Sequence, residues 1–292
     1  MAAKQIRKKV VAAETESIEE QKPAVSAAEP AAEQVKPAPK AKKPRAKKTA
    51  PAEETVSNAA GEVNDAASAA EEKPAGGELP QITVVPKKKI LFVASEATPF
   101  IATGGLAEVI GSLSKALAAN EDYDVRVVIP LYSDISWEQR TKFKYVGNLF
   151  VPLGWRSQYC GIFSYELNNV TYYFLDNEYY FKRPGCYGYY DDGERFAFFC
   201  RSVMEIMPFL NFYPDVMHCH DWQAALAAIY LKTIYCFRPE YQFIRSLFTI
   251  HNIEYQGKYS LDILEDLFGI SNNWKYLLEY NKCINLMKAA IE

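Results

Sequence analysis

The most informative segment of the chain is KILFVASEATPFIATGGLAEVIGSLSKAL, residues 89–117. Its first six residues form an apolar run of the kind found in strands buried in parallel sheets. Pro99 and the pair Gly104 and Gly105 interrupt the chain. Apolar residues then recur every three or four positions, which predicts a helix with one apolar face. A β-branched run at residues 125–129 follows, and the whole predicts a βαβ unit with its glycine loop at the carboxyl edge of a sheet.

The rest of the chain continues to alternate between strand-like and helix-like patterns. Residues 143–176 predict two or three strands joined by tight turns. Asp221 is expected to cap a helix. Further patterns predict a helix at 194–210, a strand at 216–219, a helix from 221 to about 235, a strand at 246–250, and helices at 261–268 and 276–290. We therefore predict an α/β fold with a Rossmann-like, mostly parallel sheet that is covered on both faces.

The N-terminal part of the chain has a different composition. Its first 80 residues contain no Phe, Tyr, Trp, Cys or His, and they carry 13 basic and 13 acidic side chains. Such a segment buries too little apolar surface to offset the entropy lost on ordering. We expect residues 1–81 to be a disordered tail and residues 82–292 to be one domain. The basic run at residues 40–48 could bind nucleic acid or an anionic surface, but a solvated linker is the simpler interpretation.

Composition excludes several classes of protein. The net charge of −3 argues against a protein that coats nucleic acid, so we expect no nucleic-acid partner. The sequence has no apolar run of about 18 residues that would predict a membrane span, and its N-terminus does not resemble a secretory signal. The six cysteines include no C-x-x-C pair, which predicts free thiols without a redox or zinc motif. A cytoplasmic location is the expectation.

The candidate site consists of loops that follow predicted strands, where open parallel sheets bind ligands. The first is Thr103–Gly104–Gly105, whose backbone N–H groups could approach a phosphate at a helix start. A tight turn without a ligand explains the glycines equally well. The spacing is not G-x-G-x-x-G, so a nicotinamide oxidoreductase is disfavoured.

A second loop carries two histidines. In the run HCHDW, the period of two along a strand places His218 and His220 on one face, next to Asp221 and Trp222. A metal site is disfavoured because no further metal-binding pattern accompanies them. Hydrogen bonding to a polyhydroxylated ligand suits these side chains better. A purely structural role is expected for at least one histidine.

Two further loops complete the predicted site. HNIEYQG, residues 251–257, places donors, acceptors and an aromatic ring directly after a strand. YGYYDDGERF, residues 187–196, combines tyrosines with carboxylates, which suits a sugar because rings stack on its apolar face and carboxylates accept from its hydroxyls. An exposed loop that ends in an acidic helix N-terminus is the alternative for this last segment.

Four segments in this order resemble the N-terminal half of bacterial glycogen synthase and plant starch synthase, glycosyltransferase family 5: residues 89–117, 176–199, 214–226 and 248–257. The resemblance extends over residues 82–292. It implies the first half of a GT-B fold, in which two Rossmann-like domains face each other. It also implies transfer of glucose from ADP-glucose to the non-reducing end of an α-1,4-glucan, with retention of configuration and without a metal or other cofactor.

The resemblance also implies roles for individual residues. The catalytic candidates are His218, His220 and Asp221, which would hold glucose hydroxyls near the reacting carbon. The substrate-binding candidates are Thr103, Gly104, Gly105, Tyr190, Asp191, Asp192, Arg195, Trp222, His251, Asn252, Tyr255 and Gln256.

The chain departs from the family pattern in two respects. Ala102 stands where the family has a lysine before Thr-Gly-Gly, so an expected donor contact is missing. The sequence also stops at Glu292, before the C-terminal domain that would supply the nucleotide pocket. We therefore expect this polypeptide alone to be inactive or nearly so. A non-catalytic glucan-binding module of the same fold is the alternative.

Overall fold

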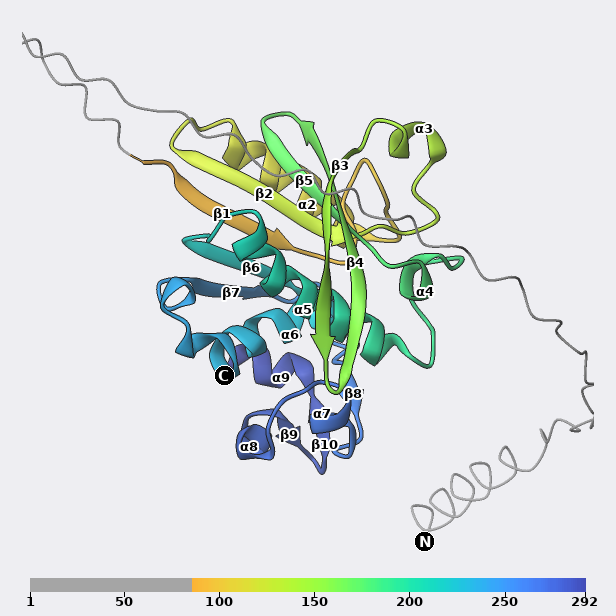
Figure 1. The fold of residues 1–292 in the computed structure, drawn as a ribbon, viewed down its shortest axis with the longest axis vertical. Coiled ribbons are helices and arrows are strands. Elements are labelled where there is room, and N and C mark those ends of the chain that lie inside the picture. Colours follow the sequence, from red (N-terminus) through yellow and green to blue (C-terminus); the bar gives the residue numbers. More distant parts are fainter. Residues whose placement is uncertain (1–85) are drawn as a thin grey trace, which may run out of the picture. The chain divides into compact units, whose positions relative to one another are not determined.

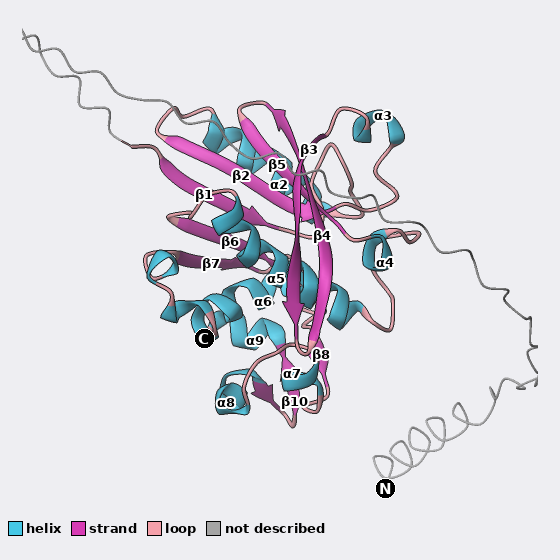
Figure 2. Ribbon diagram, viewed as in Figure 1, coloured by secondary structure: helices cyan, strands magenta, loops and turns pink. Residues whose placement is uncertain are grey.

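The computed structural model describes residues 86–292, and the predicted tail lies outside the described residues. The described part is built on a seven-stranded sheet with the strand order β3-β4-β5-β2-β1-β6-β7 (Figures 1 and 2). Its strands are β1 Lys88–Val93, β2 Tyr123–Pro130, β3 Lys144–Leu153, β4 Arg156–Leu167, β5 Val170–Asp176, β6 Val216–His220 and β7 Arg245–Thr249.

Five neighbouring strands, β5, β2, β1, β6 and β7, are parallel. The central strand β1 pairs with β2 on one side and β6 on the other, and its Phe92 and Val93 are fully buried. A strand covered on both faces needs a continuous apolar sequence, which residues 89–94 provide. The predicted Rossmann-like, mostly parallel sheet is therefore confirmed.

The strand order changes direction at β1. The chain passes from β1 through helix α2 (Gly105–Ala118) to β2 on one side, and from β6 through α6 (Asp221–Thr233) to β7 on the other. Because such crossovers are right-handed, α2 and α6 cover opposite faces of the sheet. The carboxyl ends of β1 and β6 therefore border the crevice where open α/β sheets bind ligands.

The antiparallel part of the sheet consists of three strands, which confirms the prediction for residues 143–176. Strands β3 and β4 form a long hairpin, and β4 pairs antiparallel with β5. Gly154 in the hairpin turn has φ +56°, and a Cβ there would lie 1.9 Å from the backbone oxygen of Asp266. Only glycine fits this turn, because it tolerates both the dihedral angle and the close approach. Asn168 and Asn169 make the next turn with φ of 54° and 63°.

Two buried helices complete the core. Helix α5 (Asp192–Phe209) packs against α6 and the β3–β4 hairpin, and α6 also packs against β6 and β7. Almost every residue of α6 is buried, which explains why its sequence lacks a polar face. Short helices α3 (Trp137–Arg140) and α4 (Glu178–Phe181) lie in the connections. None of the helices in residues 86–292 has the length and hydropathy needed to cross a membrane.

The C-terminal segment corrects one prediction. Residues 276–290 do not form one helix; they contain α8 (Lys275–Leu278), β9 (Glu279–Tyr280), β10 (Cys283–Asn285) and α9 (Leu286–Ile291). Asn281 and Lys282 have φ of 51° and 65°, and they turn the chain so that β9 pairs antiparallel with β10. Strand β8 (Lys258–Tyr259) pairs with the other edge of β10. Tertiary pairing therefore overrides the helical periodicity.

The predicted helix at 261–268 is also shorter than expected. Helix α7 covers only Ile263–Asp266, and Gly269, with φ +63°, follows it. The remaining short helices are 3-10 turns: η1 Tyr235–Phe237, η2 Pro239–Tyr241 and η3 Asn272–Trp274.

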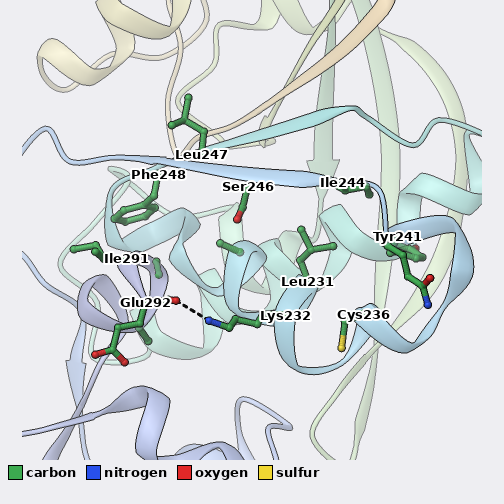
Figure 3. A pocket seen from close by; sticks show the side chains of 14 residues that line it. Leu231, Lys232, Cys236, Tyr241, Ile244, Ser246, Leu247, Phe248, Ile291 and Glu292 are labelled. Atoms are coloured by element: carbon green, nitrogen blue, oxygen red, sulfur yellow. Dashed lines mark hydrogen bonds between the residues drawn. The ribbon is translucent and has the colours of Figure 1, made fainter.

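A groove of about 480 Å³ lies beside β7, which is the edge strand of the sheet (Figure 3). Leu231 of α6, Phe248 of β7 and Ile291 of α9 are among the residues that line it. The Lys232 ammonium donates a hydrogen bond of 2.6 Å to the backbone oxygen of Glu292 at one side of this groove. Side chains distant in sequence therefore form its walls.

Candidate active site

The four predicted loops meet at one cavity of about 870 Å³, at the carboxyl ends of β1 and β6. This volume lies in the range typical of sites for small molecules. The lining residues come from all four loops, from the segment after β1 and from the first residues of α2 and α6: Glu96, Thr103, Gly104, Gly105, Leu106, Val109, Tyr187, Gly188, Asp192, Asp221, Trp222, Gln223, His251, Asn252 and Tyr255. Nine of the fifteen predicted site residues are in this set.

The glycine loop leads into the N-terminus of α2. A Cβ on Gly104 or Gly105 would meet no atom within 4 Å, and neither residue has positive φ. Neither packing nor backbone geometry therefore requires glycine here. Open space in front of a helix N-terminus leaves backbone N–H groups accessible to a ligand, which favours the ligand interpretation over the tight turn.

Glu96 holds this loop in place. Its carboxylate accepts a hydrogen bond from the Thr103 N–H, and only 3% of the residue is exposed. The neighbouring Ser95 hydroxyl lies 2.7 Å from the Tyr187 hydroxyl, so the segment that follows β1 also contacts the fourth loop. Glu96 and Tyr187 are absent from the predicted site residues. Glu96 could have been found, because it is a carboxylate directly after a buried strand.

Asp221 connects the second loop to the third. Its carboxylate accepts hydrogen bonds from the backbone N–H groups of His251, at 2.7 Å, and Asn252, at 3.3 Å. The prediction that Asp221 caps α6 is wrong. His220 occupies the N-cap position without a side-chain cap, and Asp221 is the first helical residue, with φ +57°. Its carboxylate points instead to a loop 30 residues away in sequence.

The two histidines of β6 lie on the same face, as predicted from the period of two. The ring centroids of His218 and His220 are 4.0 Å apart, and both rings pack against Phe92. Nε2 of His218 lies 2.7 Å from the Thr249 hydroxyl, and Nδ1 of His220 lies 2.9 Å from Nε2 of His251. Both rings are buried and outside the cavity lining, whereas His251 lines the cavity.

Burial controls the charge of these two histidines. Desolvation, with a smaller effect of His251, lowers the pKa of His218 to about 4. Desolvation, followed by the neighbouring His218 and His251, lowers the pKa of His220 to about 2. Both imidazoles are therefore neutral at pH 7. Residues 86–292 contain no group of three or more His, Cys, Asp or Glu side chains placed to hold a metal ion.

The fourth loop contributes fewer residues to the cavity than predicted. Asp192 lines it, accepts a hydrogen bond of 2.8 Å from the Gly188 N–H, and forms an ion pair with Arg195. Arg195 is fully buried and donates to the backbone oxygens of Tyr180 and Cys186. The Arg195 guanidinium therefore stabilises the fourth loop from the protein interior and does not line the cavity.

Three more predicted residues lie outside the lining. Tyr190 is 98% exposed, and Asp191 forms an ion pair of 2.7 Å with Arg183. The Gln256 amide donates to the backbone oxygen of Ile253 and accepts from the amide of Asn285. The side chains of Asp191 and Gln256 are thus occupied by bonds within the protein.

The charge of the cavity lining is acidic. Glu96, Asp192 and Asp221 contribute three carboxylates, and the described residues that line the cavity include no Lys or Arg. Each carboxylate already accepts a backbone N–H from one of the loops. Such a surface suits an uncharged ligand with many hydroxyl groups better than it suits a phosphate.

Comparisons with known proteins show the family of the chain. A family model described as "Starch synthase catalytic domain" matches residues 89–292. The glycogen synthase of Lactobacillus acidophilus is 48% identical over 205 residues, which are 70% of this chain and 43% of that protein. The glycogen synthase of Geobacillus stearothermophilus is 47% identical and matches 70% of this chain and 42% of that protein.

A solved structure shows the same fold. The catalytic domain of Starch Synthase IV from Arabidopsis thaliana, bound to ADP and acarbose, has a TM-score of 0.63 and 25% identity. The match covers 71% of this chain and 43% of that chain. It supports the prediction of a GT-B half. The chain spans less than half of the length of the curated relatives that it matches.

Proposed function

Because the chain belongs to the starch synthase catalytic domain family, we propose that it forms the sugar-binding lobe of an α-1,4-glucan glucosyltransferase that uses ADP-glucose. The observation that carries the proposal is the meeting of the glycine loop, the HCHD segment and the HNIEYQG segment in one polar cavity. A cavity of this size at the carboxyl ends of parallel strands is the usual place for a ligand site in an open α/β sheet.

The lining provides the groups that recognise a hexose. Asn252 and His251 offer hydrogen-bonding groups at fixed backbone positions, because Asp221 holds both N–H groups. Tyr255 and Trp222 add aromatic surface at the same cavity. Rings stack on the apolar face of a sugar, while amides, imidazoles and carboxylates bond to its hydroxyls. Positions fixed before binding reduce the entropy that binding costs.

In the proposed reaction, the bond between C1 of glucose and the β-phosphate oxygen breaks, and ADP leaves. The 4-hydroxyl of the glucan end forms the new bond to C1 on the same face, which retains the configuration, and its proton passes to the departing β-phosphate oxygen of ADP. Because the lining is acidic, the negative charge of the departing diphosphate would be stabilised by the N-terminus of α2 and by groups outside this cavity. The proposal requires no metal or other cofactor.

Binding of a neutral glucan tests the proposal directly. We expect the purified 292-residue polypeptide to bind maltoheptaose and to be retarded in gels that contain glycogen, with little or no ADP released from ADP-glucose. Tyr255→Ala should weaken glucan binding about tenfold, since an aromatic ring that becomes covered by a bound sugar contributes on the order of 1.4 kcal/mol.

Tyr276→Ala is the matched control. Tyr255 is 65% exposed and lines the cavity, whereas Tyr276 is 70% exposed and lies outside that lining. Equal loss of binding in both variants would contradict the proposed site. The absence of any glucan binding by the unmodified polypeptide would contradict the proposed function.

A second experiment separates an enzyme from a non-catalytic glucan-binding module. We would join the chain to the part of the Lactobacillus acidophilus relative that follows the matched region. Release of ADP that depends on added glycogen supports the transferase. Glucan binding by the joined protein without ADP release supports the module.

Cell fractionation would test the proposed cytoplasmic location, which agrees with six free cysteines in the described residues.

A further inference from the structure

The three histidines of the chain form one cluster at the candidate site, and His220 occupies its centre. His220 is 0% exposed and does not line the cavity, so it cannot touch a ligand there. Its Nδ1 lies 2.9 Å from Nε2 of His251, which does line the cavity. Any influence of His220 on a ligand must therefore pass through the His251 ring.

The hydrogen bond between the two rings restricts where their protons sit. A neutral imidazole has one N–H donor and one bare nitrogen acceptor. Nε2 of His220 is buried and has no hydrogen-bond partner. A buried N–H without an acceptor is rarer than a buried acceptor without a donor. The proton of His220 therefore belongs on Nδ1, from which it is donated to Nε2 of His251.

We propose that His220 is a positioning residue that keeps His251 protonated on Nδ1, so that His251 presents an N–H donor to the cavity. Since Nε2 of His251 accepts the bond from His220, its proton is left on Nδ1, which makes no hydrogen bond within residues 86–292. Asp221 fixes the backbone of the same residue through the 2.7 Å bond to its N–H. The backbone and the ring of His251 are thus held by two consecutive residues of one segment.

The identity of the ligand rests on the proposed function, but the position of the proton does not. A ring donor suits an oxygen of a sugar hydroxyl, which accepts hydrogen bonds readily. The position of His220 in the sequence does not by itself reveal this role. The sequence predicts that His220, like Asp221, contacts the ligand directly. In the structure, His220 lies outside the cavity lining and contacts His251, which lines the cavity.

Long-range proton–nitrogen NMR of the unmodified chain tests the inference without a ligand. Because the chain has only three histidines, each imidazole can be assigned by single substitution. We expect His220 and His251 each to show one tautomer, protonated on Nδ1, at neutral pH. Protonation of His251 on Nε2, or a mixture of its tautomers, would overturn the proposal.

Two substitutions at His220 sharpen the test. His220→Asn keeps a short N–H donor near the position of Nδ1, and His251 should stay protonated on Nδ1. His220→Phe keeps a ring beside Phe92 without a donor, and His251 should change to a mixture of tautomers. An unchanged His251 in a folded His220→Phe variant would contradict a positioning role. If that variant does not fold, the spectra of the unmodified chain and of His220→Asn still decide the question.

Thr249→Val is the matched control. It removes the 2.7 Å hydrogen bond between Thr249 and His218, and it leaves the hydrogen bond between His220 and His251 in place. It should alter the tautomer of His218 alone. A titration with maltoheptaose then separates the two proposals. A His251 ring that is protonated on Nδ1 and shifts on addition of glucan supports both. The same tautomer without any shift supports the positioning role and contradicts a glucan ligand at His251.

Discussion

The cavity at the strand ends and the groove beside β7 are both hollows of this domain, yet they hold their polar groups in different ways. In the cavity, Glu96, Asp192 and Asp221 each accept a backbone N–H from a loop. In the groove, Leu231, Phe248 and Ile291 contribute apolar surface, and the polar contact there joins the Lys232 ammonium to the backbone oxygen of Glu292 without a carboxylate that holds a loop (Figure 3). The comparison shows that acidic side chains in the cavity organise the loops before any ligand arrives, a property that ligand recognition needs and a packing groove does not.

The largest expected effect is that of Asp221→Ala. The substitution removes a charged acceptor from two backbone N–H groups and places alanine at φ +57°. The free energy of unfolding should fall by about 3 kcal/mol, measured by urea denaturation, and maltoheptaose binding should be lost. Asp221→Asn keeps an oxygen acceptor and tolerates this dihedral angle, so it should lose less stability. Equal losses in both variants would show that the carboxylate does not organise the loop.

Lowering the pH should destabilise the domain through the two buried histidines next to the cavity, and not through residues of the groove. His218 and His220 have lowered pKa values in the folded protein, about 4 and about 2, so their neutral forms stabilise it fully only above the unfolded value near 6.5. As the pH falls from 6.5 to 5.5, the unfolded chain gains protons that the folded protein does not, and about 2 kcal/mol of stability should be lost, roughly half through each imidazole.

Urea denaturation at several pH values measures this loss. His218→Gln should reduce the slope of stability against pH by roughly half, because one of the two buried imidazoles is removed. A stability that stays constant from pH 6.5 to 5.5 would contradict the buried neutral state of these rings.

Gly105→Ala should separate stability from binding. A Cβ at this position meets no protein atom within 4 Å, and the residue begins helix α2. Alanine should therefore raise the free energy of unfolding by about 0.5–1 kcal/mol. The added methyl group would occupy space in the cavity, so maltoheptaose binding should weaken. An unchanged affinity would show that the ligand does not approach this turn.

The smallest effect is expected in the groove. Leu247 lies on the edge strand β7, lines the groove and is half exposed. Leu247→Thr keeps strand propensity, and it should change the free energy of unfolding by no more than about 0.5 kcal/mol. Maltoheptaose affinity should stay unchanged. A loss of glucan binding in this variant would move the candidate site from the cavity to the groove.

Local patterns in the sequence predict the sheet and the meeting of the loops. Apolar runs at residues 89–94 and 125–129 and the glycine loop between them specify a βαβ unit, because each pattern reflects which faces are buried. The parallel order then brings the strand ends to one edge, so Gly104, Asp221 and His251 could be placed together from sequence.

Only the tertiary structure shows which contacts the individual side chains of the site make. The left-handed backbone at Asp221 turns its carboxylate to a distant loop, and His220 lies behind His251, although local periodicity describes both residues equally well as direct contacts. The turn at Asn281 similarly divides a segment with helical spacing, because β10 finds partners on both sides. Periodicity reports which face of an element is buried, whereas hydrogen bonds between distant segments decide what each polar atom does.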